Sequence, residues 1–252
     1  MAEKTLRVTL IRATAEADAL AALGARACYS ADDLEALQAR VAGEDQAGFL
    51  DRVMHSGHAS VAEHAVFTFG VEGVSRVLLA QLTRHRIASF SVQSQRYVAL
   101  DGAVGFDYVV PPAIAGLGSQ AVQDYHSQMA QMNAWYAAWR QRLGGAGEAA
   151  NEDARFVLPG ACCTRLLLTM NARELLHFFA LRCCSRAQWE IRALARQMLR
   201  LAFAAAPALF AQAGPGCVAS GCPEGAKTCG QAARVREDIA RLKTGRMDGE
   251  TE

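Results

Sequence analysis

The sequence contains very little lysine. Only Lys4, Lys227 and Lys243 occur among the 26 basic residues of this 252-residue chain, and the other 23 are arginines. The formal net charge is +1, so the chain lacks the excess positive charge that favours nucleic acid or an anionic membrane. Because arginine is so common here, an isolated arginine carries little information, and any anion site must be a local concentration of basic residues.

Long hydrophobic runs are also missing. The longest apolar region, 199–213, is interrupted by Arg200 and Pro207, so no membrane span is expected. Residues 1–8 lack the apolar core and small-residue cleavage site of a secretory signal, and we expect a cytoplasmic protein. In that reducing compartment, the eight cysteines favour free thiols or metal ligands over disulfides.

Strand and helix patterns are spread along the whole chain. Leu6, Val8 and Leu10 alternate with polar residues as in a half-buried strand, and Phe67 and Phe69 share one face of a second strand. We expect strands or extended segments at 6–11, 65–71, 106–110 and 162–170. We expect helices at 15–28, 32–41, 45–56, 76–83, 119–143, 148–156, from 171 onward, 189–206 and around 235–242. With no repeat or interdomain linker visible, one α/β or α+β domain is the simplest expectation.

Residues 84–97, RHRIASFSVQSQRY, hold the densest group of hydrogen-bond donors. The planar fork of arginine binds phosphate and carboxylate oxygens bidentately, so several converging arginines indicate an anionic ligand such as a nucleotide. The alternative is that Arg84 and Arg86 only stabilise the end of a helix, where a cation gains about 0.3–1 kcal/mol.

Three histidines, His55, His58 and His64, lie in a segment that we expect to be a loop. Such a cluster could bind zinc, but its spacing matches no recognised zinc motif, and structural histidines are the alternative.

A second possible metal site is the loop that contains Cys217, Cys222 and Cys229 among glycines and prolines. These thiols could hold zinc with Cys183 or Cys184 as a fourth ligand, or form a disulfide. The C-x4-C-x6-C spacing lacks a C-x2-C pair, and free thiols remain the default.

Asn171 and Glu174, at an expected helix start, have two possible roles. Asn at the N-cap with Glu three residues later resembles a capping box, worth on the order of 1 kcal/mol. A helix start also presents free N–H groups to anions, so the same residues could lie beside a phosphate or cofactor. Leu175, Phe178 and Leu181 are among the residues expected on the buried face of this helix.

The long helix expected at 119–143 has one continuous apolar stripe, which favours core or subunit packing over cofactor binding. Its members are Val122, Tyr125, Met129, Met132, Tyr136, Trp139 and Leu143.

Arg84-His85-Arg86, followed after seven residues by Ser94, resembles the signature of flavin-dependent thymidylate synthases. Other blocks resemble the same family in the expected order, over roughly residues 6–210. They are His58 to Ser60 with Glu63-His64, Gln81, Arg96-Tyr97, Arg155 ahead of 157–159, Asn171 to Arg173, and 181–182 followed by 187–190.

This resemblance implies an enzyme that converts dUMP into dTMP with FAD, NADPH and methylene-tetrahydrofolate. It also implies a homotetramer whose sites lie between subunits, with no nucleic-acid or membrane partner. We therefore expect an α/β (α+β) fold, in which a small, mainly antiparallel sheet is packed by several helices. The family domain would span 1–213, and 214–252 would be a cysteine-rich loop and a polar tail whose last residues, 244–252, are disordered.

The resemblance also assigns individual residues. Those expected to hold or position FAD are His58, Ser60, Arg84, His85, Arg86, Asn171, Arg173 and His177. Those expected to hold dUMP are Gln81, Arg84, Val92, Gln93, Ser94, Gln95, Arg96, Arg155 and Arg182. Arg182 is the expected catalytic residue, because a cation against the uracil edge stabilises negative charge developing on the ring.

Two positions depart from the family pattern. Val92 stands where many relatives have Glu or Gln, so only its backbone can contact substrate, and His177 stands where some relatives have Asn. No cysteine lies in the motif, and Ser94 has no evident general base. We therefore expect Ser94 to be a hydrogen-bond donor rather than a nucleophile.

Two other classes of protein compete with the enzyme. A nucleotide- or RNA-binding module would use Arg84, Arg86 and Arg96 on phosphates, with affinity that falls steeply with salt. A metal-stabilised structural protein would be built on the cysteine loop and would contain zinc.

Overall fold

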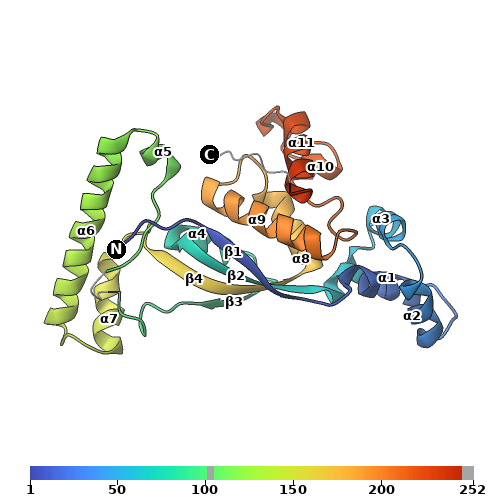
Figure 1. Cartoon of the computed structure of the whole chain (residues 1–252), viewed down its shortest axis with the longest axis horizontal. Helices are drawn as coiled ribbons and strands as arrows, with labels where there is room; N and C mark the ends of the chain where they lie inside the picture. Colours follow the sequence, from blue (N-terminus) through green and yellow to red (C-terminus); the bar gives the residue numbers. More distant parts are fainter. Residues whose placement is uncertain (101–104, 246–252) are drawn as a thin grey trace.

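The computed structural model describes residues 1–100 and 105–245. A four-stranded sheet occupies the middle of the molecule, with α6 standing across one end and α1 to α3 gathered at the other (Figure 1). The strands are β1 (Arg7–Ala13), β2 (Val66–Ser75), β3 (Ser89–Val92) and β4 (Cys163–Asn171). Their order is β1-β2-β4-β3 and each pairing is antiparallel, which confirms the expected small antiparallel sheet with helices.

The helices expected from the sequence all occur, with ends within a few residues of the expected bounds, whereas short helices at Pro112–Ala115 and Gly216–Ala219 were not expected. The α-helices are α1 (Ala17–Ala27), α2 (Leu34–Ala42), α3 (Ala47–His55), α4 (Arg76–Leu82), α5 (Pro112–Ala115), α6 (Ser119–Arg142), α7 (Glu148–Ala154), α8 (Ala172–Arg182), α9 (Trp189–Ala205), α10 (Gly216–Ala219) and α11 (Ala232–Lys243). Three 3₁₀ turns join them, η1 (Ala59–His64), η2 (Arg155–Val157) and η3 (Gly225–Lys227). None of the helices within the described residues is long and apolar enough to cross a membrane.

The sheet buries one face. Phe67 and Phe69 of β2, with Leu166 and Leu168 of β4, are buried in one core with residues of α8 and α9. Between them, residues of the opposite parity such as Leu167 remain exposed. This alternation is the period-two pattern of the sequence, and it places the helices on one side of the sheet.

β2 contains a bulge at Gly73, where its register with β4 shifts between Glu72 and Val74. Gly73 has φ +69°, and a Cβ there would lie 2.1 Å from the carbonyl oxygen of Thr5. Only glycine accommodates both the left-handed conformation and this close approach.

A buried carboxylate fixes the start of α4, the helix that leads into the arginine-rich motif. The Glu190 carboxylate accepts hydrogen bonds from the backbone N of Ser75 at 2.6 Å and from its Oγ at 2.5 Å. Ser75 Oγ in turn accepts from the backbone N of Leu78 at 3.0 Å. Burial raises the pKa of Glu190, and the bonds from Ser75 oppose that shift.

We expect Glu190→Ala to lower the free energy of unfolding by about 1–3 kcal/mol, since it leaves buried donors of Ser75 unpaired. Urea denaturation measures this change. Glu237→Ala is the matched control, because Glu237 is a largely exposed glutamate on α11. Equal stability of the two variants would show that the Glu190 bonds contribute nothing.

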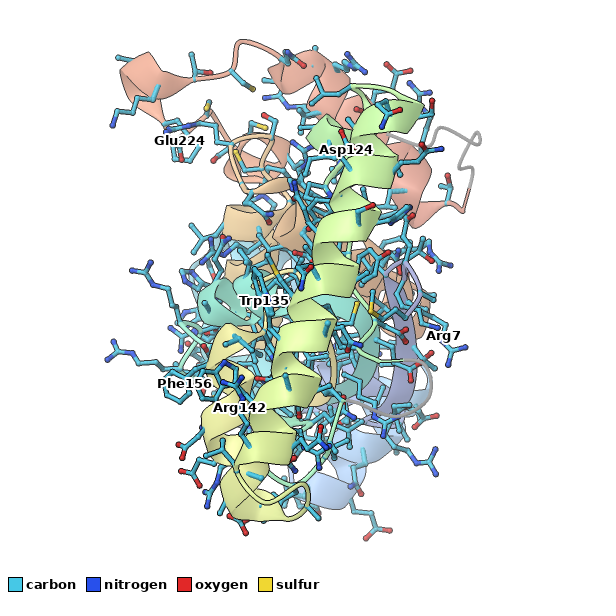
Figure 2. The ribbon with its side chains drawn as sticks, turned by 90° about the vertical axis from the view of Figure 1, so that its left-hand side faces the viewer. Arg7, Asp124, Trp135, Arg142, Phe156 and Glu224 are labelled. Carbon is cyan, nitrogen blue, oxygen red and sulfur yellow. The ribbon has the colours of Figure 1, made fainter. Side chains whose placement is uncertain are left out.

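A second, smaller core lies at the α6 end, where Phe106, Tyr108 and Cys162 pack against Met129. The expected α6 stripe is buried only in part, because Trp139 and Leu143 at its end are 45% and 42% exposed. Figure 2 looks onto α6, with Trp135 labelled beside it and Phe156 on the neighbouring η2.

Several sequence expectations need correction. The segment with the three histidines contains the 3₁₀ turn η1 rather than only loop, and the strand β3 inside the motif was not expected. Leu181 is 48% exposed rather than buried, because it lies on the solvent side of α8. Residues 106–110 are extended, with isolated bridges at Tyr108 only. Of the residues expected to be disordered, 244–252, Thr244 and Gly245 form a turn at the end of α11, and 246–252 lie outside the described residues.

Candidate active site

The first group of predicted site residues meets where the end of α4 faces α8. His85, just after α4, is only 5% exposed, while its neighbours Arg84 and Arg86 are exposed. His85 Nδ1 lies 3.1 Å from Glu174 Oε1, and Arg182 Nε donates to His85 Nε2 at 3.0 Å. Helix α8 therefore contacts the motif through both its first and last turns.

These hydrogen bonds fix the protonation of His85. A guanidinium Nε–H can only donate, so Nε2 must be an acceptor and the ring proton must be on Nδ1, where it is donated to Glu174. Burial lowers the pKa of His85, the hydrogen bond to Glu174 raises it, and the charge of Arg182 lowers it, with a net lowering. The neutral imidazole is thus the favoured form.

Positive charge is concentrated beside this histidine. Burial and the nearby charge of Arg84 lower the pKa of Arg182. Within residues 1–100 and 105–245, Arg84 and Arg86 have no carboxylate partner, and the two terminal nitrogens of Arg182 have no hydrogen-bond partner. Together with the exposed His177, these side chains offer several unpaired donors to an anionic ligand.

The capping-box prediction is half right. Asn171 Oδ1 accepts from the backbone N of Glu174 at 2.8 Å, as an N-cap should. The Glu174 carboxylate, however, binds His85 instead of returning to the backbone of Asn171. The tertiary contact with a buried histidine replaces the local one.

The second group of predicted residues, His58 and Ser60, lines a cleft of about 550 Å³ between η1 and the helices α1, α2 and α3. Tyr29 also lines this cleft, with its hydroxyl 3.2 Å from His58 Nε2. Arg173, on the first turn of α8, forms an ion pair with Glu63 of η1. This ion pair connects η1, which lines the cleft, to the first turn of α8, which also carries Glu174 of the first group.

The third group follows β3. Gln93 N donates to Arg165 O at 3.0 Å, and Arg76 Nη2 donates to Gln93 O at 2.7 Å. Ser94 Oγ accepts from Arg96 N at 3.2 Å, and Gln95 Nε2 lies 3.7 Å from the thiol of Cys162. Val92 pairs with Leu166 through its backbone.

Arg96 is paired with two glutamates of α7. It forms an ion pair with Glu148, and its Nε lies 3.0 Å from Glu152 Oε2. Asn151 Nδ2 also donates to Arg96 O at 2.8 Å, and Arg155 Nε donates to Glu152 O at 3.1 Å. The predicted nucleotide residues Arg96 and Arg155 thus lie together against α7.

A single chain does not bring all the predicted substrate residues together. Gln81, Arg84 and Arg182 belong to the group around His85. Arg155 and the run from Gln93 to Arg96 lie instead by α7, near the other end of β2. That strand has 10 residues, so its ends are about 30 Å apart at roughly 3.3 Å per residue.

The cysteine-rich loop is a separate place in the fold. Cys184, Cys217, Cys222 and Cys229 line one small cavity, and each of the eight cysteines is a free thiol. In the part of the chain that the structure describes, no group of three or more His, Cys, Asp or Glu side chains could hold a metal ion. The zinc alternatives for this loop and for the histidine segment therefore lack geometric support.

Sequence reasoning missed four residues that hold the site together. Tyr29 contacts His58, Arg76 holds the Gln93 carbonyl, and Glu148 and Glu152 pair with Arg96. The only available signal was the i, i+4 spacing of Glu148 and Glu152, which puts both carboxylates on one face of a helix. Nothing in that spacing identifies the arginine that they contact.

Comparisons with known proteins identify the family to which this chain is similar. A family model described as thymidylate synthase complementing protein matches residues 9–208. The chain is 49% identical over 231 residues to a flavin-dependent thymidylate synthase of Geobacter sulfurreducens, covering 92% of this chain and 97% of that relative. A flavin-dependent thymidylate synthase of Clostridium tetani is 42% identical over 242 residues, covering 92% of this chain and 96% of that relative.

A solved structure is similar to this fold. It is a UMP/dUMP methylase, PolB, from Streptomyces cacaoi, bound with 5-Br dUMP. The two chains superpose with a TM-score of 0.68 at 26% sequence identity, covering 83% of this chain and 95% of that chain.

Proposed function

Because the chain belongs to the family of flavin-dependent thymidylate synthases, we propose that it methylates dUMP at C5 of the uracil to give dTMP. Methylene-tetrahydrofolate is the proposed carbon donor, and FAD reduced by NADPH is the proposed hydride source. The observation that carries the proposal is the convergence of Arg84, His85 and Arg182 between α4 and α8.

The role proposed for Arg182 is electrostatic. Its terminal nitrogens, which have no partner in the described parts of the chain, are placed against the uracil edge in this proposal. A fixed cation there stabilises the negative charge that develops on the ring when C5 attacks the one-carbon group of the donor. Arg84 adds positive charge beside it and can reach a phosphate or a second carbonyl oxygen.

The available donors suit FAD. Arg84 and Arg86 present hydrogen-bond donors to a diphosphate. The neighbouring cleft of about 550 Å³ lies within the usual range of small-molecule sites, about 300–1,000 Å³. When bound, FAD supplies the hydride chemistry that no side chain of this protein can perform. His58, Ser60, Asn171, Arg173 and His177 would hold or position it.

The chain offers no suitable protein nucleophile in the nucleotide group. Ser94 Oγ contacts the Arg96 amide, and among the described residues no basic side chain accepts its proton. Burial raises the pKa of Cys162 to about 11 and that of Cys163 to about 12. Both thiols are therefore protonated at neutral pH, and a protonated thiol is a poor nucleophile.

We further propose a homotetramer with sites shared between subunits. The separation of the two groups of substrate residues in one chain supports it, since a partner subunit could supply the missing half. The apolar side chains left exposed at the α6 end, such as Trp135 at 52% and Phe156 at 82% (Figure 2), suit a subunit contact.

The direct test is a dTMP assay with dUMP, methylene-tetrahydrofolate, NADPH and FAD, omitting each component in turn. We expect dTMP only in the complete mixture and a visible flavin spectrum from the purified protein. UMP offered in place of dUMP measures the selectivity for the deoxyribose. Absence of flavin binding after FAD is added would contradict the proposed function.

A further inference from the structure

We propose that Glu174 and His85 are positioning residues that aim the guanidinium of Arg182 at the substrate. Glu174 sets the tautomer of His85, and His85 holds one nitrogen of Arg182 so that the other two face the ligand. This inference rests on the proposed function, in which Arg182 is the catalytic cation. It assigns His85 a task other than contacting flavin through its ring.

The Nε–H group of Arg182 needs an acceptor without a proton. Arg182 Nε–H binds His85 Nε2 at 3.0 Å, which requires that Nε2 carry no proton. A carboxylate that accepts from Nδ1–H favours this tautomer, and Glu174 Oε1 is 3.1 Å from Nδ1. Without Glu174 the imidazole could carry its proton on Nε2, directly opposite the Arg182 donor.

Packing against α8 holds the ring of His85 in place. The ring of Phe178 packs edge-on against His85 at 4.9 Å between centroids, and His177 lies 6.0 Å away. Glu174, Phe178 and Arg182 are spaced four residues apart on α8, so they share one helix face, and His85 lies against that face. The Asn171 cap fixes the first turn of the same helix.

The place of His85 between Glu174 and Arg182 preserves the charge of Arg182. If Glu174 bound Arg182 directly, its carboxylate would occupy the guanidinium fork and neutralise the cation. A neutral imidazole placed between them uses only Nε of Arg182. The two terminal nitrogens remain without a partner within the described residues, so they keep their charge and their bidentate geometry for a ligand.

Both ring nitrogens of His85 are therefore occupied, and the residue is 5% exposed. The flavin contact that the resemblance assigns to His85 can come only from its backbone. Arg84 and Arg86, exposed on either side of His85, keep side chains that can reach the cofactor.

Two substitutions of His85 separate the roles. In His85→Gln the amide oxygen can occupy the place of Nε2 and accept from Arg182. In His85→Asn the shorter amide reaches only the place of Nδ1. We expect His85→Gln to keep kcat for dTMP formation within about fivefold and His85→Asn to lower it about 100-fold, as misplacement of a catalytic group does. Both variants should retain flavin.

Glu174 provides an independent pair, which protects the test if a His85 variant misfolds. Glu174→Gln keeps an oxygen that accepts from Nδ1–H and should retain most of the activity. Glu174→Met removes the acceptor and should lower kcat by a similar factor to His85→Asn. Circular dichroism and thermal melting establish whether each variant is folded.

The double variant with Arg182→Ala decides between positioning and direct contact. The dUMP dissociation constant, measured from changes in the flavin spectrum, should rise in His85→Asn. The same substitution should change it less than about twofold in the Arg182→Ala background, because the two residues act as one unit. An equal effect in both backgrounds, or loss of flavin from both His85 variants, would overturn the inference. If wild-type protein makes no dTMP but this coupling in dUMP binding is found, the proposed function is wrong and the positioning stands.

Discussion

Replacing Arg182 by alanine should reduce dTMP formation by about 100-fold to 1,000-fold, the usual cost of removing one donor from a charge-stabilising site. The purified variant should keep its flavin spectrum, because Arg182 contributes only one cation beside Arg84 and Arg86. Steady-state kcat and a flavin absorbance spectrum measure the two properties on the same sample.

Two further variants identify the cause of the loss. Arg182→Lys keeps a positive charge but lacks the planar fork and the Nε donor to His85, so it should restore only part of the turnover. Arg234→Ala removes an arginine that is 69% exposed on α11 and should leave kcat unchanged. Near-normal turnover by Arg182→Ala would exclude Arg182 from catalysis.

The helices and long strands could be predicted because their hydrophobic periodicity spans many residues. β3 could not, because it has only four residues, SFSV, and its hydrogen-bond partners lie in β4, with Ser89 opposite Thr169. A strand this short is defined by its partner rather than by its own pattern. The sequence therefore shows the motif only as a donor-rich segment, although Ser89–Val92 within it are paired in the sheet.

The residues of the candidate site could be named from the motif, but not their contacts. Asn171 and Glu174 fit a capping box, and that local explanation hid a contact between Glu174 and His85 across 89 positions in the sequence. Likewise, Arg96 resembled a free phosphate ligand, whereas Glu148 and Glu152 pair with it. Local patterns cannot show which distant side chain competes for a charged group.

The position of the two groups relative to the sheet has a consequence for assembly. Arg173 follows Asn171, which pairs with Val66 at the start of β2. Burial and the nearby charge of Arg155 lower the pKa of Arg76, which lies just beyond the other end of β2. If FAD and dUMP bind in one site that needs both Arg155 and Arg173, two chains can form it. One chain then contributes the start of β2 and the other chain contributes the opposite end of its own β2.

Mixed oligomers of Arg155→Ala and Arg173→Ala should therefore be active although each variant alone is not. Each single variant is expected to lose at least about 100-fold in kcat. If a site takes one arginine from each of two subunits, random mixing leaves roughly a quarter of the sites intact. Co-expression with two different affinity tags isolates the mixed oligomers, and dTMP formation per flavin measures the recovery.

Mixing Arg173→Ala with Arg182→Ala is the matched control, because both residues lie on α8 in the same half-site, and it should give no recovery. Inactive mixed oligomers of Arg155→Ala and Arg173→Ala would mean that each chain builds its site alone, so that the approximately 30 Å along β2 would have to be bridged within one subunit.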